Sequence, residues 1–445
     1  MSGTHKKKIT MPKLLDIFTK LAFFGFVICS PINWISIFNI GGLSIKYMHL
    51  AIIPIVPCIL FKSFRYTVIK FIQKNAFIII SFILLMIANF VATCLNRTLY
   101  PNALSYITKN FSYCCYFILF AAVMYFRVKQ PSFYKEITYS NALSVAMFIL
   151  TATIIFHALG RSFLGDMASF FMKGDSVSLR YDLFKILFNA DSSGDSELAA
   201  NLRNTLMGAF IYIHFTSLYA SFNVESRRLK YLNLSIILFS GFFVLASVSR
   251  SNILALVIGY FIYFVSEILI NRNTKKLLQL IGVAVIALTL TLIFWNKIED
   301  AFSNSTSMIA GRLSELEDDA RWELDAEAIN GFSNNFFIGK GSGATLSDGH
   351  SVHNFIIGSA YQAGVTGLIF SLCFYFGIMF KMFASLPVLS RYRGTLLIAS
   401  LVTIPLLRSM ESGNVGTLSL VEWFCLAIFL STLMRIRERE QIKVS

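Results

Sequence analysis

The chain has 445 residues, of which 56% are hydrophobic and 15% aromatic, whereas only 14% are charged. This composition excludes an ordinary soluble domain and indicates a chain whose solvent is mostly hydrocarbon. The formal net charge of +15 does not indicate a nucleic-acid partner, because no basic patch interleaved with aromatic residues lies on a soluble segment.

Runs of predominantly apolar residues recur along the whole sequence, each close to the roughly 20 residues that cross a bilayer as a helix. We therefore predict an all-α polytopic membrane protein with about twelve transmembrane helices. The runs lie near residues 21–40, 48–61, 76–94, 111–126, 141–159, 205–222, 232–248, 253–270, 277–295, 355–380, 395–407 and 418–434. Pro54 and Pro57 predict that the short second run is kinked or incomplete.

Lys and Arg alternate between the two sides of these runs. One side has basic clusters within 6–13, 62–74, 127–135, 227–230, 272–276, 381–393 and 435–443, whereas the other has only Lys46, Arg97, Lys109, Arg250 and Arg408. Because positive residues near span ends stay in the cytoplasm, both termini are predicted to be cytoplasmic. Segments 160–204 and 296–354 then form two long periplasmic loops of a single integral membrane domain, residues 1–445.

The seven cysteines lie in or beside the predicted spans and show no metal-ligand spacing. We expect small core side chains without a disulfide framework. The first outer loop mixes charged with apolar residues, which predicts short amphipathic helices on the bilayer surface. A solvated loop without a ligand is an equally consistent interpretation.

The second outer loop is more specific. Apolar residues recur with a helical period between Arg312 and Ile329, which predicts a helix that carries Arg321. The glycines of the following string, from Gly339 to Gly343, permit a tight turn and close backbone approach to a ligand. The string is not a phosphate-binding P-loop, because it lacks that motif's spacing.

Two histidines, His350 and His353, precede the span at 355–380, and a helical continuation would place them on neighbouring positions. Without a clear third ligand, a metal site is not favoured. A histidine at the membrane surface can accept a proton from a sugar hydroxyl near neutral pH. The alternative is a structural histidine at the start of the helix.

Arg250 and Arg408 lie at the outer ends of predicted spans. The planar guanidinium is the expected partner of a lipid phosphate or diphosphate at this depth. The alternative is that both side chains extend to lipid headgroups.

Taken in order, these motifs resemble the O-antigen polymerase and O-antigen ligase superfamily of bacterial envelopes. The resemblance covers about residues 245–370 in detail and the rest by topology. The matching motifs are Ser249-Arg250, Arg312, Arg321-Trp322, the string Phe-Ile-Gly-Lys-Gly-Ser-Gly at 337–343, His353-Asn354, Gly364 and Gly367.

The resemblance implies a metal-independent glycosyltransferase without a cofactor, with a fold like that of the GT-C class, in the bacterial inner membrane. Its donor would be a glycan on undecaprenyl diphosphate, bound through the diphosphate at the periplasmic face by Arg250 and Arg321, with Arg312 as a weaker candidate. His353 would orient or deprotonate the attacking hydroxyl. Asn354 would help set the helix start, with Gly341 and His350 in supporting positions.

Two departures limit the resemblance. Some polymerases have an Arg, ten residues, Gly pattern in both outer loops, but Arg321 to Gly331 is one residue short. The first loop lacks the pattern, so no roles pass to Arg161, Arg180 or Arg203.

We favour a polymerase, which adds the chain to another lipid-linked repeat unit, over a ligase, which transfers it to lipid A core. Membrane lipids, chain-length regulators and flippases are the partners that this implies. A transporter or flippase is a more distant alternative, for which His214 is the main polar mid-span candidate. A noncatalytic membrane scaffold is a third.

Overall fold

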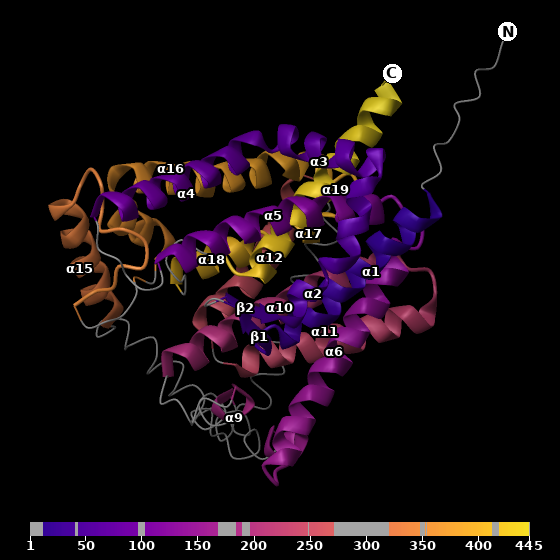
Figure 1. Ribbon diagram of the computed structural model, residues 1–445. Helices are drawn as coiled ribbons and strands as arrows, with labels where there is room; N and C mark the ends of the chain where they lie inside the picture. Colours follow the sequence, from indigo (N-terminus) through magenta and orange to yellow (C-terminus); the bar gives the residue numbers. More distant parts are fainter. Residues whose placement is uncertain are drawn as a thin grey trace.

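The computed structural model describes residues 12–40, 43–96, 103–167, 184–188, 196–247, 249–270, 320–347, 352, 354–411 and 418–444. In this part of the chain the helices dominate (Figure 1). They are α1 (Lys13–Cys29), α2 (Tyr47–Leu50), α3 (Lys62–Lys74), α4 (Ala76–Asn96), α5 (Ala103–Arg127), α6 (Phe133–Ala158), α9 (Phe184–Phe188), α10 (Ser196–Asn223), α11 (Arg227–Ala246), α12 (Arg250–Leu269), α15 (Ala320–Asn334), α16 (Phe355–Leu389), α17 (Leu396–Ser400), α18 (Thr403–Glu411) and α19 (Leu420–Val444), with 3-10 turns η1 (Ser30–Ile32) and η2 (Ile53–Leu60).

Six helical segments of the described chain are long and apolar enough to cross a membrane, or up to seven if one sharply bent pair counts as a span. This confirms a mainly helical, polytopic membrane protein but not the predicted number of about twelve spans. The predicted runs at 205–222, 232–248 and 418–434 fall in the long helices α10, α11 and α19, which do not meet the same criterion. The run at 395–407 forms the short helices α17 and α18, and 277–295 lies outside the described residues.

The predicted break at Pro54 and Pro57 is confirmed. This segment forms the 3-10 turn η2 rather than an α-helix, since proline lacks the N–H that an α-helix interior requires. The segment from Tyr47 to Leu60 is bent by 109° relative to α3.

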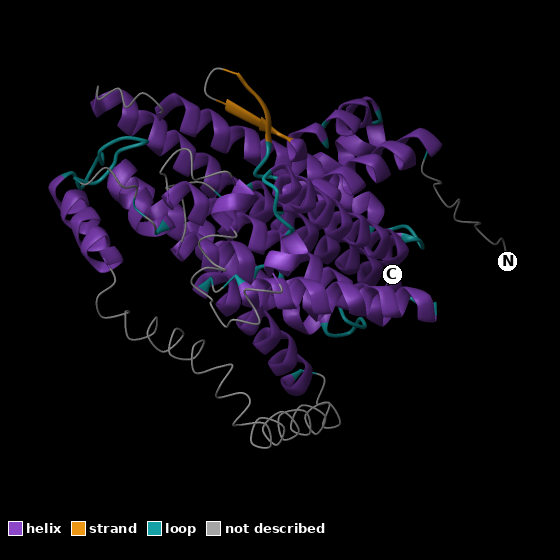
Figure 2. Cartoon of the chain, turned by 90° about the horizontal axis from the view of Figure 1, so that it is seen from below, coloured by secondary structure: helices purple, strands orange, loops and turns teal. Residues whose placement is uncertain are grey.

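Two sequence expectations are corrected near this break and in the first loop. The predicted run at 21–40 is helical only as far as Ile32, after which Ser36–Ile40 and Leu43–Lys46 form the antiparallel hairpin β1–β2. The fold is therefore not purely α-helical, and Figure 2 shows this hairpin outside the helical body. Pro31 and the β-branched isoleucines around residue 36 favour this change from helix to strand. In addition, α10 begins at Ser196, inside the predicted loop 160–204.

The core is an aromatic-rich interior in which α19 packs against α5, and α16 packs along α4 (Figure 1). Buried Trp423 of α19 joins these pairs, because its ring centroid lies 4.7 Å from that of Phe82 and 4.9 Å from that of Phe117. Such pairs add roughly 0.5–1.5 kcal/mol each beyond simple burial. All seven cysteines are free.

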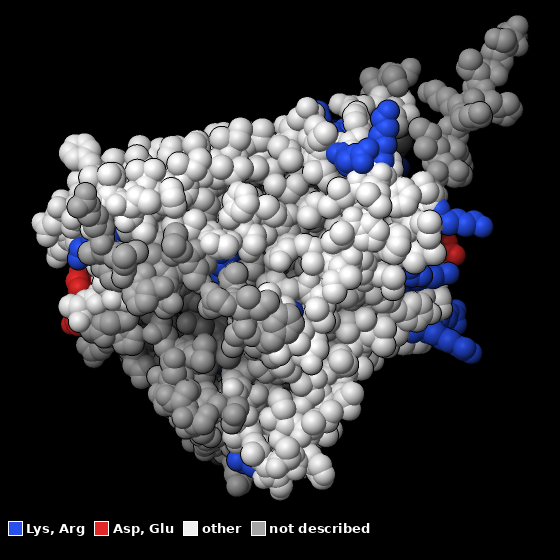
Figure 3. All heavy atoms as spheres, in the orientation of Figure 1, with Lys and Arg blue, Asp and Glu red and all other residues white. Residues whose placement is uncertain are grey.

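Basic residues gather at one end of the bundle, which we call the basic end and define by Lys74, Arg127, Lys381, Arg391 and Arg435. Lys381 Nζ donates to the Lys74 carbonyl at 2.6 Å, and Arg391 pairs with Glu440 at 2.8 Å, so these helix ends lie together. In Figure 3 the blue side chains concentrate along the edge near the start of α1 and the end of α19. The broad surface between the ends is largely uncharged, as a lipid-facing surface requires.

Candidate functional site

The described segments that carry the sequence motifs lie toward the other end of the bundle, which we call the distal end. It contains the last residues of α4 and α11 and the first residues of α5, α12 and α16. Helix α11 starts near the basic end, where Asn223 Nδ2 donates to the Arg393 carbonyl, and its 20 residues span about 30 Å. Arg250, four residues after the last residue of α11, therefore starts α12 at the distal end. Figure 1 shows α15, which contains Arg321, beyond the ends of α4 and α16.

A small polar network fixes the start of α12 beside Arg250. Asn252 Nδ2 donates to Ser249 Oγ at 2.7 Å, and Ser249 Oγ donates to Asn204 Oδ1 on α10 at 2.8 Å. Ser249 and Asn252 are buried, so this network holds the backbone of Arg250 in a defined position. The side chain of Arg250 itself lies outside the described residues, as do those of Arg321 and Arg408.

Arg203 lies next to this network, although no sequence pattern assigned it a role. Its side chain is 5% exposed, and it precedes Asn204 on α10. Its buried position on α10 therefore places a second arginine near the start of α12, which is Arg250. No motif identifies Arg203, and only the pairing of α10 with α12 brings it to this end.

The glycine string forms a clamp on α16. Helix α16 is interrupted at Ala363 and Gly364, where Gly364 has φ +63° and ψ −152°. This break leaves the carbonyls of Tyr361 and Gln362 without their usual helical donors, and the N–H groups of Lys340 and Gly341 donate to them at 2.9 and 2.8 Å. In return, the N–H of Val365 donates to the Phe336 carbonyl at 2.7 Å. We call segments 336–342 and 361–365 together the glycine clamp.

Two glycines of the clamp are required by close backbone approach. A Cβ on Gly364 would lie 2.6 Å from the Phe336 carbonyl oxygen, and one on Gly339 would lie 2.5 Å from the Gln362 backbone. Both residues also have positive φ, which other residues rarely adopt. Backbone packing within the clamp therefore explains Gly339 of the string and Gly364 of α16.

The clamp is attached to the last turn of α4. Asn96 Nδ2 donates to the Gly339 carbonyl at 2.8 Å, and the Ser342 N–H donates to Thr93 Oγ1 at 2.8 Å. Gly341, with φ +93°, lies against the Thr93 backbone. Segments about 240 residues apart in the chain are thus fixed together at the distal end.

Lys340 places one more positive charge beside the clamp. Its Nζ donates to the Tyr361 hydroxyl at 3.1 Å, and that hydroxyl donates to the Thr345 carbonyl at 3.0 Å. Lys340 is half-buried, and its Nζ also lies 4.9 Å from the centroid of the Tyr361 ring.

The predicted helix with Arg321 is confirmed from Ala320 onward, because Ala320–Asn334 forms α15, whereas residues 312–319 lie outside the described residues. Arg312, His350 and His353 lie outside the described residues, so the roles predicted for them remain predictions. Asn354 is the N-cap of α16, and its Oδ1 accepts from the N–H groups of Ile356 at 2.9 Å and Ile357 at 3.2 Å. Helix α16 begins at Phe355, and the helical continuation predicted for His350 and His353 falls outside the described residues.

A second cationic group at the distal end lies near the start of α5, and we call it the lysine pair: Lys46 and Lys109. The N–H of Lys46 donates to His49 Nδ1 at 2.9 Å, and the His49 ring lies 5.9 Å from the Tyr113 ring. Lys109 Nζ lies 5.8 Å from the centroid of that same tyrosine. The cluster thus joins the hairpin, α2 and α5.

The lysine pair is not neutralised by a carboxylate within the described residues. Burial, and then the nearby charge of Lys109, lower the pKa of Lys46 to about 8. Two cations that repel one another favour binding of an anion between them. The sequence signal was that Lys46 and Lys109 are among the few basic residues on the predicted outer side.

No family model matches this chain, and the comparison with curated proteins finds no match. The fold and the helix ends define the class: a polytopic membrane protein, mainly helical, with charged and glycine-rich segments gathered at the distal end.

Proposed function

We propose that this protein is an O-antigen-type polysaccharide polymerase, which transfers a growing glycan from undecaprenyl diphosphate to another lipid-linked repeat unit at the periplasmic face. The observation that supports it most directly is the common location of Arg250, α15, the glycine clamp and Asn354 at the distal end. These are the segments that carry the family resemblance, and the end opposite to them is the basic one, as expected for the cytoplasmic side.

The proposed reaction requires positive charge at the leaving group. The acceptor hydroxyl oxygen attacks C1 of the donor sugar, the bond from C1 to the diphosphate oxygen breaks, and the diphosphate leaves with the electron pair. Arg250 and Arg321, with Arg312 as a weaker candidate, would stabilise that charge, and His353 would receive the hydroxyl proton. The lysine pair and Lys340 add cations at the same end of the bundle.

The proposed chemistry uses no metal or cofactor and depends on protein groups held in fixed positions. Contacts at the distal end support such rigidity. The clamp fixes the loop between α15 and α16 to α4, and the Asn204 network fixes the start of α12. Preorganised donors stabilise developing charge better than mobile ones, because they need no reorganisation during the reaction.

The test is incubation of the purified, reconstituted protein with undecaprenyl-diphosphate-linked repeat unit alone, with products separated by size. We expect a ladder of longer lipid-linked glycans. Arg250→Ala and Arg321→Ala should each slow ladder formation on the order of 100-fold. Arg391→Ala is the matched control, since it removes an exposed arginine at the basic end.

Other outcomes would reject the proposal. Transfer only after addition of lipid A core would indicate a ligase. Movement of intact donor across the vesicle membrane without elongation would indicate a transporter. Equal ladders from wild type and both arginine variants would contradict the assigned role of these residues.

A further inference from the structure

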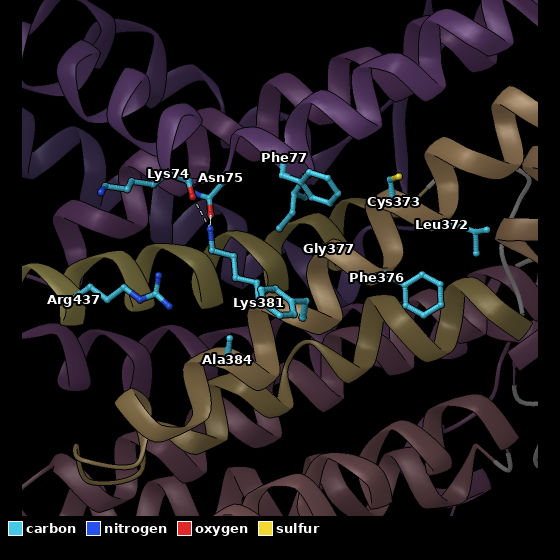
Figure 4. A pocket seen from close by; sticks show the side chains of 12 residues that line it. Lys74, Asn75, Phe77, Leu372, Cys373, Phe376, Gly377, Lys381, Ala384 and Arg437 are labelled. Carbon is cyan, nitrogen blue, oxygen red and sulfur yellow. Dashed lines mark hydrogen bonds between the residues drawn. The ribbon is translucent and has the colours of Figure 1, made fainter.

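An apolar groove lies on the lipid-facing side of α4 and α16, toward the basic end (Figure 4). It has a volume of about 780 Å³. Phe77 of α4 and Phe376 and Phe380 of α16 line it, and all three side chains are strongly exposed outside the protein core. Gly377 allows the Phe77 ring to approach α16, because a Cβ there would lie 2.8 Å from Phe77 Cε1.

The groove changes character along its length. Figure 4 shows Lys74, Lys381 and Arg437 at one end, whereas Leu372, Cys373 and Phe376 lie at the other. A smaller cavity of about 160 Å³ adjoins the basic end of the groove and shares these three cations with it. The site therefore combines an apolar channel with a compact cationic head.

The cations at the head have no carboxylate partner within the described residues. Lys381 Nζ donates to the Lys74 carbonyl and to Asn75 Oδ1, which leaves its positive charge uncompensated. The side chains of Lys74 and Arg437 form no ion pair in this part of the chain. The one carboxylate that lines the smaller cavity, Glu438, already pairs with Lys70 at 2.7 Å and with Arg435 at 3.4 Å.

We propose that this groove binds an anionic glycerophospholipid of the bilayer, with its phosphate at Lys74, Lys381 and Arg437 and an acyl chain along Phe77, Phe376 and Phe380. Three uncompensated cations at one end match a phosphate, and the aromatic channel matches a hydrocarbon chain. This inference is independent of the proposed polymerase activity, because the groove lies toward the opposite end from the glycine clamp.

The dimensions of the groove fit one leaflet. From Leu372 to Ala384, α16 rises by about 18 Å. One leaflet contributes about half of the ~30 Å hydrocarbon thickness. An acyl chain can therefore extend along the groove while its phosphate stays at the height of the basic end.

The test uses the full chain in detergent and measures lipid binding by native mass spectrometry. The probes are phosphatidylglycerol and phosphatidylcholine with identical acyl chains, and inorganic phosphate. We expect phosphatidylglycerol to bind more tightly than phosphatidylcholine. Lys74→Gln combined with Arg437→Gln should weaken phosphatidylglycerol binding on the order of 30-fold, because each basic residue near a lipid phosphate contributes several-fold.

A matched double variant separates a specific site from general surface charge. Arg227→Gln with Lys230→Gln removes two exposed cations at the same end, outside the groove, and should leave binding unchanged. A second test of the groove is Ala384→Trp, which fills the channel without changing charge and should reduce binding of both lipids.

Several results would overturn the inference. These are equal binding of the two lipids by the wild type, equal losses in the two double variants, and unchanged binding in a folded Ala384→Trp protein. If inorganic phosphate competes at concentrations similar to the lipid, the head is a free-anion site and the lipid assignment is wrong.

Discussion

The two ends of α5 differ in whether their basic residues have carboxylate partners. At the basic end, Arg127 is 1% exposed and is held by two carboxylates: its Nε donates to Glu136 Oε2 at 2.9 Å, and its Nη1 donates to Asp16 Oδ1 at 2.6 Å. At the distal end, Lys109 lies beside Lys46 without a described carboxylate. The first arrangement is neutralised within the protein, whereas the second has no carboxylate partner among the described residues.

This difference separates structural charge from functional charge. Arg127, paired with two carboxylates, joins α1, α5 and α6. Its charge is already neutralised, so it has no free charge to offer a ligand. Lysines that repel one another cost stability until a ligand arrives, and proteins retain such groups where they bind or react. The contrast can be tested by removing charge at each end of the same helix.

Arg127→Met should have the largest effect. It leaves Glu136 buried and uncompensated, so the expected loss is about 3–5 kcal/mol in the free energy of unfolding. Thermal unfolding in detergent measures it. Adding Glu136→Gln should restore part of the loss, and Arg391→Met, which breaks an exposed pair, should cost less than about 1 kcal/mol. Equal losses of unfolding free energy in Arg127→Met and Arg391→Met would show that the buried pairs of Arg127 are not a major source of stability.

Gly364→Ala should be the next most damaging, because it breaks the clamp that makes the distal end rigid. The unusual backbone alone costs about 1–3 kcal/mol, and the new Cβ also meets the Phe336 carbonyl. The control is Gly160→Ala, which has φ +68° but open space around it, so only backbone strain acts there. Similar melting temperatures for the two variants would show that the clamp is not tightly packed.

Lys46→Gln combined with Lys109→Gln should affect ligand binding rather than stability, whereas Arg127→Met should affect stability. Removing two repelling cations should leave the melting temperature unchanged or raise it, while undecaprenyl diphosphate binding falls at least tenfold. Binding of the isolated lipid diphosphate, measured by intrinsic fluorescence, tests this apart from turnover. A lower melting temperature with unchanged binding would make the pair structural instead.

The smallest effect is a pH dependence of the same binding. Lys46 has a lowered pKa of about 8, so it is protonated below that pH and loses its charge as pH rises through it. A bound anion favours the protonated form, so affinity should be constant below about pH 7 and fall above pH 8, by at most about tenfold per pH unit. The Lys46→Gln variant should show a weaker dependence than the wild type. An affinity that rises above pH 8 would contradict the assignment.

The local chemistry of several elements followed from their residues. Pro54 and Pro57 predicted the broken segment after the hairpin, and the apolar period around Arg321 predicted α15. The glycine string predicted a tight turn. Each depends on backbone or side-chain properties that act within a few residues.

The sequence interpretation was incomplete where contacts come from distant segments. The hairpin at Ser36–Lys46 was missed because an apolar run of that length is compatible with either a strand or a helix. The glycine string was predicted to allow close backbone approach to a ligand, and the structure adds a close approach that was not predicted, to the backbone of Tyr361 and Gln362. No local pattern reveals that a break in α16 frees those two carbonyls.

By itself, the sequence determined the helical membrane class and the concentration of basic residues at one set of helix ends, because hydropathy and charge act on each segment separately. The tertiary structure decided which charges are neutralised. Arg127 meets Asp16 and Glu136, whereas Lys46 meets Lys109, and these pairings depend on how α1, α5, α6 and the hairpin pack. The type of a residue tells whether it is charged. Whether that charge is neutralised depends on side chains from distant segments, which only folding brings close to it.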